Sequence, residues 1–222
     1  MSRHQGPRQL ALALHHAESF AREDFLSGPS NATALALIDR WPDWPGQAVV
    51  LVGPEGSGKS HLAAIWAEDA GARFLSARAL DAALPAALAT GALVVEDIAA
   101  GDFDERAMFH LVNLAREEQA FVLFTARSPP AGWEIGIRDL ASRLKALPVV
   151  TVTAPDDMLL RAVLVKLFSD RQLAVDEGLV GFVARRIERS IAAARTVVAE
   201  LDREAMRQQR PLTRVLAAEV LG

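Results

Sequence analysis

The chain has 222 residues, of which 51% are hydrophobic, and it contains no cysteine. That length suits one large domain or two small ones, and the lack of cysteine excludes disulfides and thiolate metal sites. No apolar run approaches the roughly 18 residues of a membrane span, and the N-terminal "LALAL" lacks the length and the cleavage site of a secretory signal. We therefore expect a cytoplasmic protein. The net charge of −4 disfavours a protein that acts mainly by neutralising DNA phosphates.

The chain begins with a short, largely apolar peptide, "RQLALALHH" (8–16), within a segment that we delimit as 1–18. A glutamine precedes leucines at alternate positions in this peptide. Chain termini are usually frayed and polar unless something holds them. The peptide is therefore expected either to bind a partner or to fold back on its own domain. The side chains concerned are Gln9, Leu10, Leu12 and Leu14.

Between residues 19 and 153 the sequence alternates strand-like apolar runs with helical segments. Three of the strand candidates contain continuous apolar runs, which is typical of strands buried on both faces of a parallel sheet. The segments between them, such as 105–119, are rich in Ala, Leu and Glu. This alternation predicts an α/β domain with a parallel sheet flanked by helices. The strands are expected at 48–53, 72–77, 91–98, 120–126 and 147–153.

The segment "GPEGSGKS" (53–60) fits the pattern G-x-x-x-x-G-K-[ST] and lies directly between a strand and a helix. Glycines there permit a loop whose N–H groups converge on a phosphate, and the next helix adds its positive N-terminal end. Lys59 would reach the β- and γ-phosphates, and the Ser60 hydroxyl would hold Mg²⁺. The predicted nucleotide-binding residues are Gly53, Pro54, Gly56, Ser57, Gly58, Lys59, Ser60 and His61.

Two carboxylates, Glu96 and Asp97, end the strand "LVVED". Another strand, at 72–77, comes between this strand and the P-loop strand along the chain, which is typical of P-loop ATPases rather than of kinases. Glu96 is predicted to hold Mg²⁺ and Asp97 to orient water, both in catalytic roles. The customary first residue is Asp, and the extra methylene of Glu96 moves its carboxylate by about 1.5 Å. We therefore expect slow hydrolysis. The alternative is a solvated strand end.

After Pro155 the strand pattern ends. Pro155 and two aspartates are a good helix start, and the rest of the chain has helical periodicity. Residues 154–222 are therefore expected to form a small all-helical domain.

A P-loop, an acid pair and a helical C-terminal segment together resemble the AAA+ class. Three stretches are similar to the replication initiator DnaA and its relatives. "DFLSGPSNATALALI" (24–38) resembles the N-linker that packs on adenine, which implies a base contact for Phe25. "DLASRL" (139–144) resembles the box that carries an arginine finger, which implies that role for Arg143. "FTARSPP" (124–130) resembles the sensor 1 strand.

A short N-terminal peptide before such a core resembles the Hda family, the regulatory inactivators of DnaA. The resemblance implies bound ADP or ATP with Mg²⁺, and binding of Gln9, Leu10, Leu12 and Leu14 to the sliding clamp of DNA polymerase III. It also implies that Arg143 completes the active site of DnaA–ATP in trans. A homodimer is a further option, and we expect neither sequence-specific DNA binding nor membrane binding.

Two positions depart from the DnaA pattern. Arg127 stands at the sensor 1 position, where Asp or Asn is usual, and Ala192 stands at the sensor 2 arginine, with Arg189 and Arg195 three residues to either side. Both changes favour a protein that holds a nucleotide as a structural ligand, with weak or absent hydrolysis of its own.

Two rival functions remain open. A helicase-loader-like AAA+ ATPase would hydrolyse ATP and bind single-stranded DNA, but the acidic balance, the changed sensor positions and the clamp-like peptide argue against it. A small-molecule P-loop kinase is disfavoured by the strand at 72–77, by Arg143 and by the helical C-terminal segment.

Overall fold

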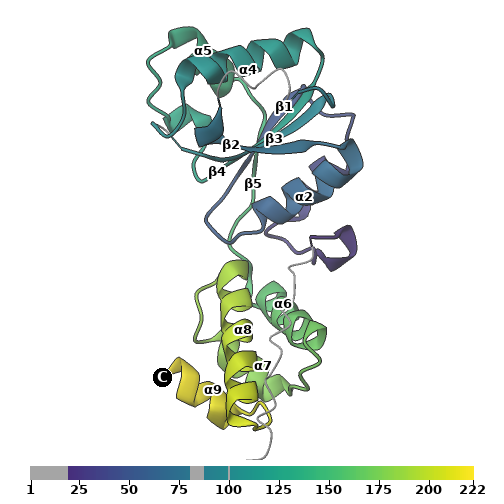
Figure 1. Ribbon diagram of the computed structural model, residues 1–222, viewed down its shortest axis with the longest axis vertical. Helices are drawn as coiled ribbons and strands as arrows, with labels where there is room; N and C mark the ends of the chain where they lie inside the picture. Colours follow the sequence, from purple (N-terminus) through teal and green to yellow (C-terminus); the bar gives the residue numbers. More distant parts are fainter. Residues whose placement is uncertain (1–19, 81–87, 100) are drawn as a thin grey trace, which may run out of the picture.

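A computed structural model describes residues 20–80, 88–99 and 101–222. Its centre is a five-stranded parallel sheet with the strand order β2–β3–β4–β1–β5 (Figure 1). Each strand lies within two residues of its expected range, so the predicted parallel sheet is confirmed. The strands are β1 (Ala48–Val52), β2 (Arg73–Ser76), β3 (Ala92–Ile98), β4 (Phe121–Ala126) and β5 (Val149–Thr151).

The strand order separates the acidic strand β3 from the P-loop strand β1. β4 lies between them and pairs Ala126 with Val52 on one side and Phe124 with Val95 on the other. In open parallel sheets, ligands bind beyond the carboxyl ends of the strands. The P-loop after β1 and the acid pair near the end of β3 therefore lie at the same edge, although another strand separates them.

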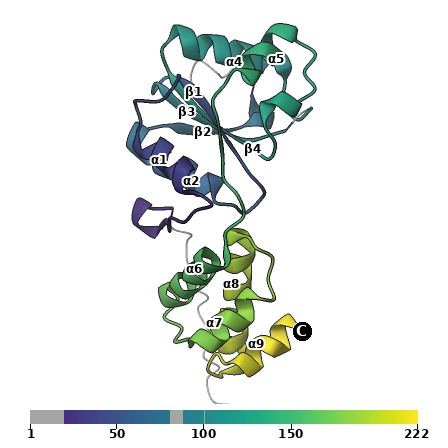
Figure 2. The ribbon, with the colours of Figure 1, turned by 180° about the vertical axis from the view of Figure 1, so that it is seen from behind.

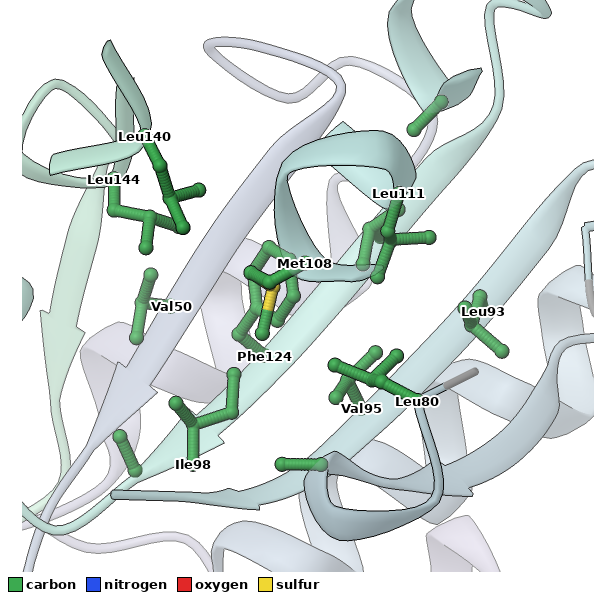
Figure 3. Packing of buried hydrophobic residues seen from close by; sticks show 14 of the residues in the cluster. Val50, Leu80, Leu93, Val95, Ile98, Met108, Leu111, Phe124, Leu140 and Leu144 are labelled. Carbon is green, nitrogen blue, oxygen red and sulfur yellow. The ribbon is translucent and has the colours of Figure 1, made fainter. Parts of the chain in front are cut away.

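Helices cover both faces of the sheet, because successive strand residues point to opposite faces. On one face, α1 (Ala32–Asp39) and α2 (Lys59–Ala70) pack against residues such as Val49 and Leu51. On the other, α4 (Glu105–Glu117) and α5 (Arg138–Lys145) pack against Val50 and its neighbours. Figure 3 shows Met108 of α4 over Phe124, and Leu140 and Leu144 of α5 beside Val50.

An aromatic cluster fills the α1–α2 face. Trp44 stacks on Trp66 with ring centroids 4.9 Å apart, and both Trp41 and Trp44 contact Phe121 edge-on. The indole N–H of Trp44 donates to the carbonyl of Leu37 at 2.8 Å. These two tryptophans of "RWPDWPG" therefore belong to the core beneath β1.

Four helices follow the sheet and share a separate hydrophobic core that includes Leu164, Phe168 and Leu201. A side chain caps the N-terminus of each: Asp156, Asp176, Ser190 and Thr213 accept from backbone N–H groups of the first turn. The expected boundary between residues 153 and 154 falls in the link between β5 and the first of these helices. They are α6 (Asp157–Asp170), α7 (Glu177–Ala184), α8 (Ile191–Gln208) and α9 (Arg214–Leu221).

Figures 1 and 2 show these four helices, called the lid below, beyond the carboxyl ends of the strands, while α4 and α5 lie at the opposite end of the molecule. The described residues also include three short 3₁₀ helices: η1 (Arg22–Asp24), η2 (Ala77–Ala79) and η3 (Pro130–Gly132). Within the described ranges, no helix is long and apolar enough to cross a membrane.

Candidate nucleotide-binding site

A cavity of about 1000 Å³ lies between the carboxyl edge of the sheet and the lid. Its walls come from the segment around η1, the P-loop, the ends of β3 and β4, and helices α6 and α8. Most of the predicted nucleotide-binding residues line it: Gly56, Ser57, Gly58, Lys59, Ser60, His61 and Phe25. Gly53 and Pro54 do not line it, and their carbonyls face Lys59 instead.

The P-loop requires glycine at particular positions. Gly56 and Gly58 have φ angles of 70° and 101°, in the left-handed region that side chains disfavour. A Cβ on Gly53 would lie 2.1 Å from the carbonyl oxygen of Val152. Gly58 is also the N-cap of α2, so the positive end of that helix faces the cavity.

Two buried polar groups of the loop suit a bound anion. Lys59 is buried, with 8% of the residue exposed, and its ammonium donates to the carbonyls of Gly53 and Pro54, both at 2.8 Å. Burial lowers the pKa of Lys59, while the nearby Asp97 carboxylate opposes that shift. The Ser57 hydroxyl is buried and has no hydrogen-bond partner among the described residues. A phosphate would supply a partner to both groups.

The two carboxylates at the end of β3, Glu96 and Asp97, differ in their position relative to the cavity. Asp97 lines the cavity, whereas Glu96 does not and is paired in register with Ser76 of β2. The β3–β4 register shifts between Val95 and Ile98, Asp97 has a φ of 55°, and its N–H donates to the Thr125 hydroxyl at 3.1 Å. The shift and the left-handed backbone of Asp97 interrupt the regular strand at this point, and of the two carboxylates only Asp97 lines the cavity. The Mg²⁺ role of Glu96 stays a prediction, and Asp97 is the better placed carboxylate.

Aromatic side chains form the other end of the cavity. The His61 ring makes edge-to-face contacts with Phe20 and Phe25, at centroid distances of 5.4 and 5.1 Å. The Nε2 atom of His61 lies 3.0 Å from the carbonyl oxygen of Ala21, which only accepts, so Nε2 carries the proton. Burial lowers the pKa of His61 and keeps the ring neutral. An apolar, aromatic wall of this kind suits a purine base.

The lid touches the P-loop directly. The N–H of Ile191, the first residue of α8, donates to the carbonyl of Gly56 at 2.7 Å. Ala192 and Arg195 both line the cavity, and the Arg195 guanidinium lies 5.2 Å from the ring centroid of Phe20. Arg189 is not among the lining residues. The position predicted as sensor 2 is therefore an alanine beside the loop, and an arginine one turn later reaches the aromatic end of the cavity.

Several residues that line the cavity could not have been predicted from any pattern in the sequence. Phe20 lies outside the stretch that resembles the N-linker. The cations Lys166 and Arg203 lie on α6 and α8, and Arg171 directly follows α6; charges are ordinary on the surface of such helices. Lys166 forms ion pairs with Asp24 at 2.7 Å and with Asp170 at 3.0 Å. Only the fold brings these groups to the cavity.

Arg143 does not line this cavity. It lies on α5, where it pairs with Asp139 at 3.1 Å and its guanidinium lies 5.6 Å from the ring centroid of Phe109. Its side chain is 33% exposed. Figures 1 and 2 place α5 at the end of the molecule away from the lid. The residues predicted to bind the clamp, Gln9, Leu10, Leu12 and Leu14, lie outside the described residues.

No protein-family model matches the sequence. Solved structures nevertheless share the fold. Domain III of the Thermotoga maritima replication initiation protein DnaA matches with a TM-score of 0.76 and 17% identity, over 91% of this chain and 95% of that one. AMPPCP-bound DnaA from Aquifex aeolicus matches with 0.69 and 14%, over 86% and 69%. The Thermotoga maritima RuvB Holliday junction branch migration motor matches with 0.69 and 15%, over 90% and 70%.

These likenesses show the fold: the chain has the AAA+ fold, with a P-loop α/β core and a small helical lid, and the predicted fold class is confirmed. Within that class its structure is similar to domain III of DnaA.

Proposed function

We propose that this protein is a nucleotide-binding regulator of replication initiation, of the kind that inactivates DnaA. It binds ADP or ATP with Mg²⁺ in the cavity beneath the lid and hydrolyses it slowly or not at all. Through Gln9, Leu10, Leu12 and Leu14 it binds the sliding clamp. There it presents Arg143 to the ATP bound by a neighbouring DnaA and promotes its hydrolysis, which makes it a negative regulator in the cytoplasm.

The main support for nucleotide binding is the P-loop itself. The buried Lys59 ammonium and the unpartnered Ser57 hydroxyl meet at the N-terminus of α2, next to an aromatic wall. Ser60 is exposed at the same point, and with Asp97 or Glu96 it would hold Mg²⁺. The ion would neutralise phosphate charge. AMPPCP is bound by one of the DnaA structures with this fold.

The position of Arg143 supports action in trans. An arginine finger stabilises the charge that develops on a transferred phosphoryl group, which requires the guanidinium to reach the phosphates. Because α5 lies away from the protein's own cavity, Arg143 can reach only a nucleotide held by another molecule. Its i,i+4 partner Asp139 is 58% exposed, so this ion pair is weak and easily exchanged.

The test is hydrolysis of ATP bound to DnaA, with the full-length protein and clamp loaded on DNA. Arginine fingers contribute a factor of about 10³ or more, so Arg143→Ala is expected to abolish the stimulation. Arg138→Ala is the matched control, because Arg138 is exposed on the same helix. Equal stimulation by both variants would contradict the proposal.

The clamp part needs its own measurement. Binding to the cognate clamp is expected at micromolar affinity or better for the intact protein, and the double variant Gln9→Ala/Leu12→Ala is expected to lose it. His15→Ala, from the same peptide, is the control. If the intact protein does not bind the clamp and instead binds single-stranded DNA at a stated salt concentration, the proposal fails and a helicase-loader-like function takes its place.

A further inference from the structure

We infer that Glu105 and Phe109, on one face of α4, are positioning residues for Arg143. Glu105 fixes the start of α5, and Phe109 holds the guanidinium that this helix presents to another molecule. The inference rests on the proposed function, in which Arg143 acts on a nucleotide bound by DnaA. It goes further, because it assigns the placement of Arg143 to residues of a different helix, outside the stretch 139–144 that predicted its role.

Glu105 makes two hydrogen bonds to the backbone that leads into α5. Its Oε1 atom accepts from the N–H of Gly136 and its Oε2 atom from the N–H of Ile137, both at 2.9 Å. A carboxylate that accepts two N–H groups at this distance makes strong, directional contacts. The first residue of α4 is thereby tied to the N-cap of α5, which is Ile137.

The position of α5 depends on such contacts. The helix has eight residues, and isolated helices of that length are marginal in water. Leu140 and Leu144 bury its inner face in the core beneath α4 (Figure 3), but apolar contacts are non-directional and do not fix the register of a helix. The Ile137 side chain makes no cap hydrogen bond. The Glu105 carboxylate therefore supplies the directional contact at the start of α5, where a negative charge also suits the helix dipole.

The next turn of α4 contacts the arginine itself. Phe109 follows Glu105 by four residues and so lies on the same face of α4. The Arg143 guanidinium lies 5.6 Å from the centroid of the Phe109 ring, within the range of a cation–π contact. Asp139 of α5 accepts from the Nε and Nη2 atoms of Arg143, both at 3.1 Å. The guanidinium is thus held between a ring of α4 and a carboxylate of its own helix.

This placement matters because an arginine finger must reach the transferred phosphoryl group in a defined geometry. A misplacement of about 1 Å can lower a rate about a hundredfold. A long side chain that is already held in place also loses less conformational freedom when it engages its target. Loosening α5 is therefore expected to lower the maximal rate of hydrolysis, without weakening the association of the two proteins to the same extent.

The experiment measures hydrolysis of ATP bound to DnaA against the concentration of the full-length protein, with clamp loaded on DNA. Glu105→Ala is expected to lower the maximal rate about tenfold or more and to change the half-saturating concentration less than about twofold. Glu105→Gln keeps the length without the charge and should fall in between. Phe109→Leu should lower the maximal rate about threefold, whereas Phe109→Tyr, which keeps the ring, should not.

Asp176→Ala is the matched control. The Asp176 carboxylate also accepts from a backbone N–H, that of Leu179 at 2.7 Å, but it caps α7 of the lid. Helix α7 does not line the cavity, and Figures 1 and 2 place it at the other end of the molecule from α5. Loss of this cap should lower the stability of the protein and leave the stimulated hydrolysis unchanged.

Hydrogen exchange of the full-length protein gives a readout that does not involve DnaA. The N–H groups of Gly136 and Ile137 should exchange at least about tenfold faster in Glu105→Ala and at an unchanged rate in Asp176→Ala. A normal maximal rate in Glu105→Ala, an equal loss in Asp176→Ala, or unchanged exchange in Glu105→Ala would overturn the inference while leaving the role of Arg143 in place. If the unmodified protein does not stimulate DnaA, the proposed function fails, and the role of Glu105 in hydrolysis fails with it.

Discussion

Two arginines of the α/β core differ in their position relative to the candidate nucleotide-binding site. Arg127 directly follows β4, lines the cavity and pairs with Glu55 of the P-loop. Arg143 packs over Phe109 and lies on α5, a helix at the end of the molecule away from the lid (Figure 1). One arginine therefore lies at the cavity of its own molecule, and the other does not. The sheet accounts for this difference, because open parallel sheets bind ligands beyond their carboxyl edge, whereas α5 ends near the amino edge, shortly before β5 begins.

The largest expected effect is a loss of stability and of nucleotide affinity when the hydrophobic core of the lid is disrupted, with no change in the region around α5. Phe168 is fully buried among the lid helices, and Phe168→Ala should cost about 3–5 kcal/mol. We expect nucleotide affinity to fall sharply, because α8 supplies one wall of the cavity. Hydrogen exchange of the α5 amides should stay unchanged. Phe74→Ala, at a 47% exposed phenylalanine, is the control, and faster exchange in α5 would show that the two regions are not independent.

The second largest expected effect is a loss of nucleotide binding without a change in the fold. Lys59→Met keeps the length of the side chain but removes the ammonium, and it should weaken nucleotide binding about a hundredfold. Circular dichroism should be unchanged, since a buried charge is lost rather than created. Lys145→Ala, at an exposed lysine of α5, should bind nucleotide normally. If Lys59→Met retains affinity, the cavity does not bind phosphate at its P-loop end.

The sequence predicts the regular strands and the P-loop well. It predicts poorly which side chains from distant segments meet at the cavity. The strands and the P-loop follow local patterns, so β1 to β5 and the loop from Gly53 to Ser60 lie where expected. The inward turn of Asp97 depends on a register shift against β4, which no local pattern encodes. Phe20 and Lys166 reach the cavity only because the η1 segment and α6 meet there.

A third, smaller effect tests the contact between the lid and the P-loop. Gly56→Ala places a Cβ 2.8 Å from that of Ala192 and also forces a side chain into the left-handed region. Gly71→Ala shares the positive φ of 62° but meets no atom within 4 Å. Gly71→Ala should therefore cost only the backbone strain, about 1–2 kcal/mol, in thermal unfolding. Gly56→Ala should cost more and also weaken nucleotide binding; equal losses would mean that the lid moves freely from the loop.

The smallest effect is a pH dependence at the base end of the cavity. Burial lowers the pKa of His61 from its ordinary value of 6.5. Below that pH His61 is protonated in the unfolded chain but stays neutral in the folded protein until its lower pKa is reached. The free energy of unfolding therefore falls as the pH falls. The contribution is fully present above pH 6.5 and is lost below it, by at most about 1.4 kcal/mol per pH unit.

Denaturant unfolding between pH 7.5 and 5 measures this dependence. His61→Gln should flatten it relative to the unmodified protein, and His110→Gln, at an exposed histidine of α4, should not. Parallel curves for all three proteins would show that the His61 ring accepts its second proton without leaving Ala21. Since Phe20 and Phe25 both pack on this ring, protonation should also loosen the wall that we assign to the base. Nucleotide affinity should then fall with stability over the same pH range, and binding to DnaA through Arg143 should not.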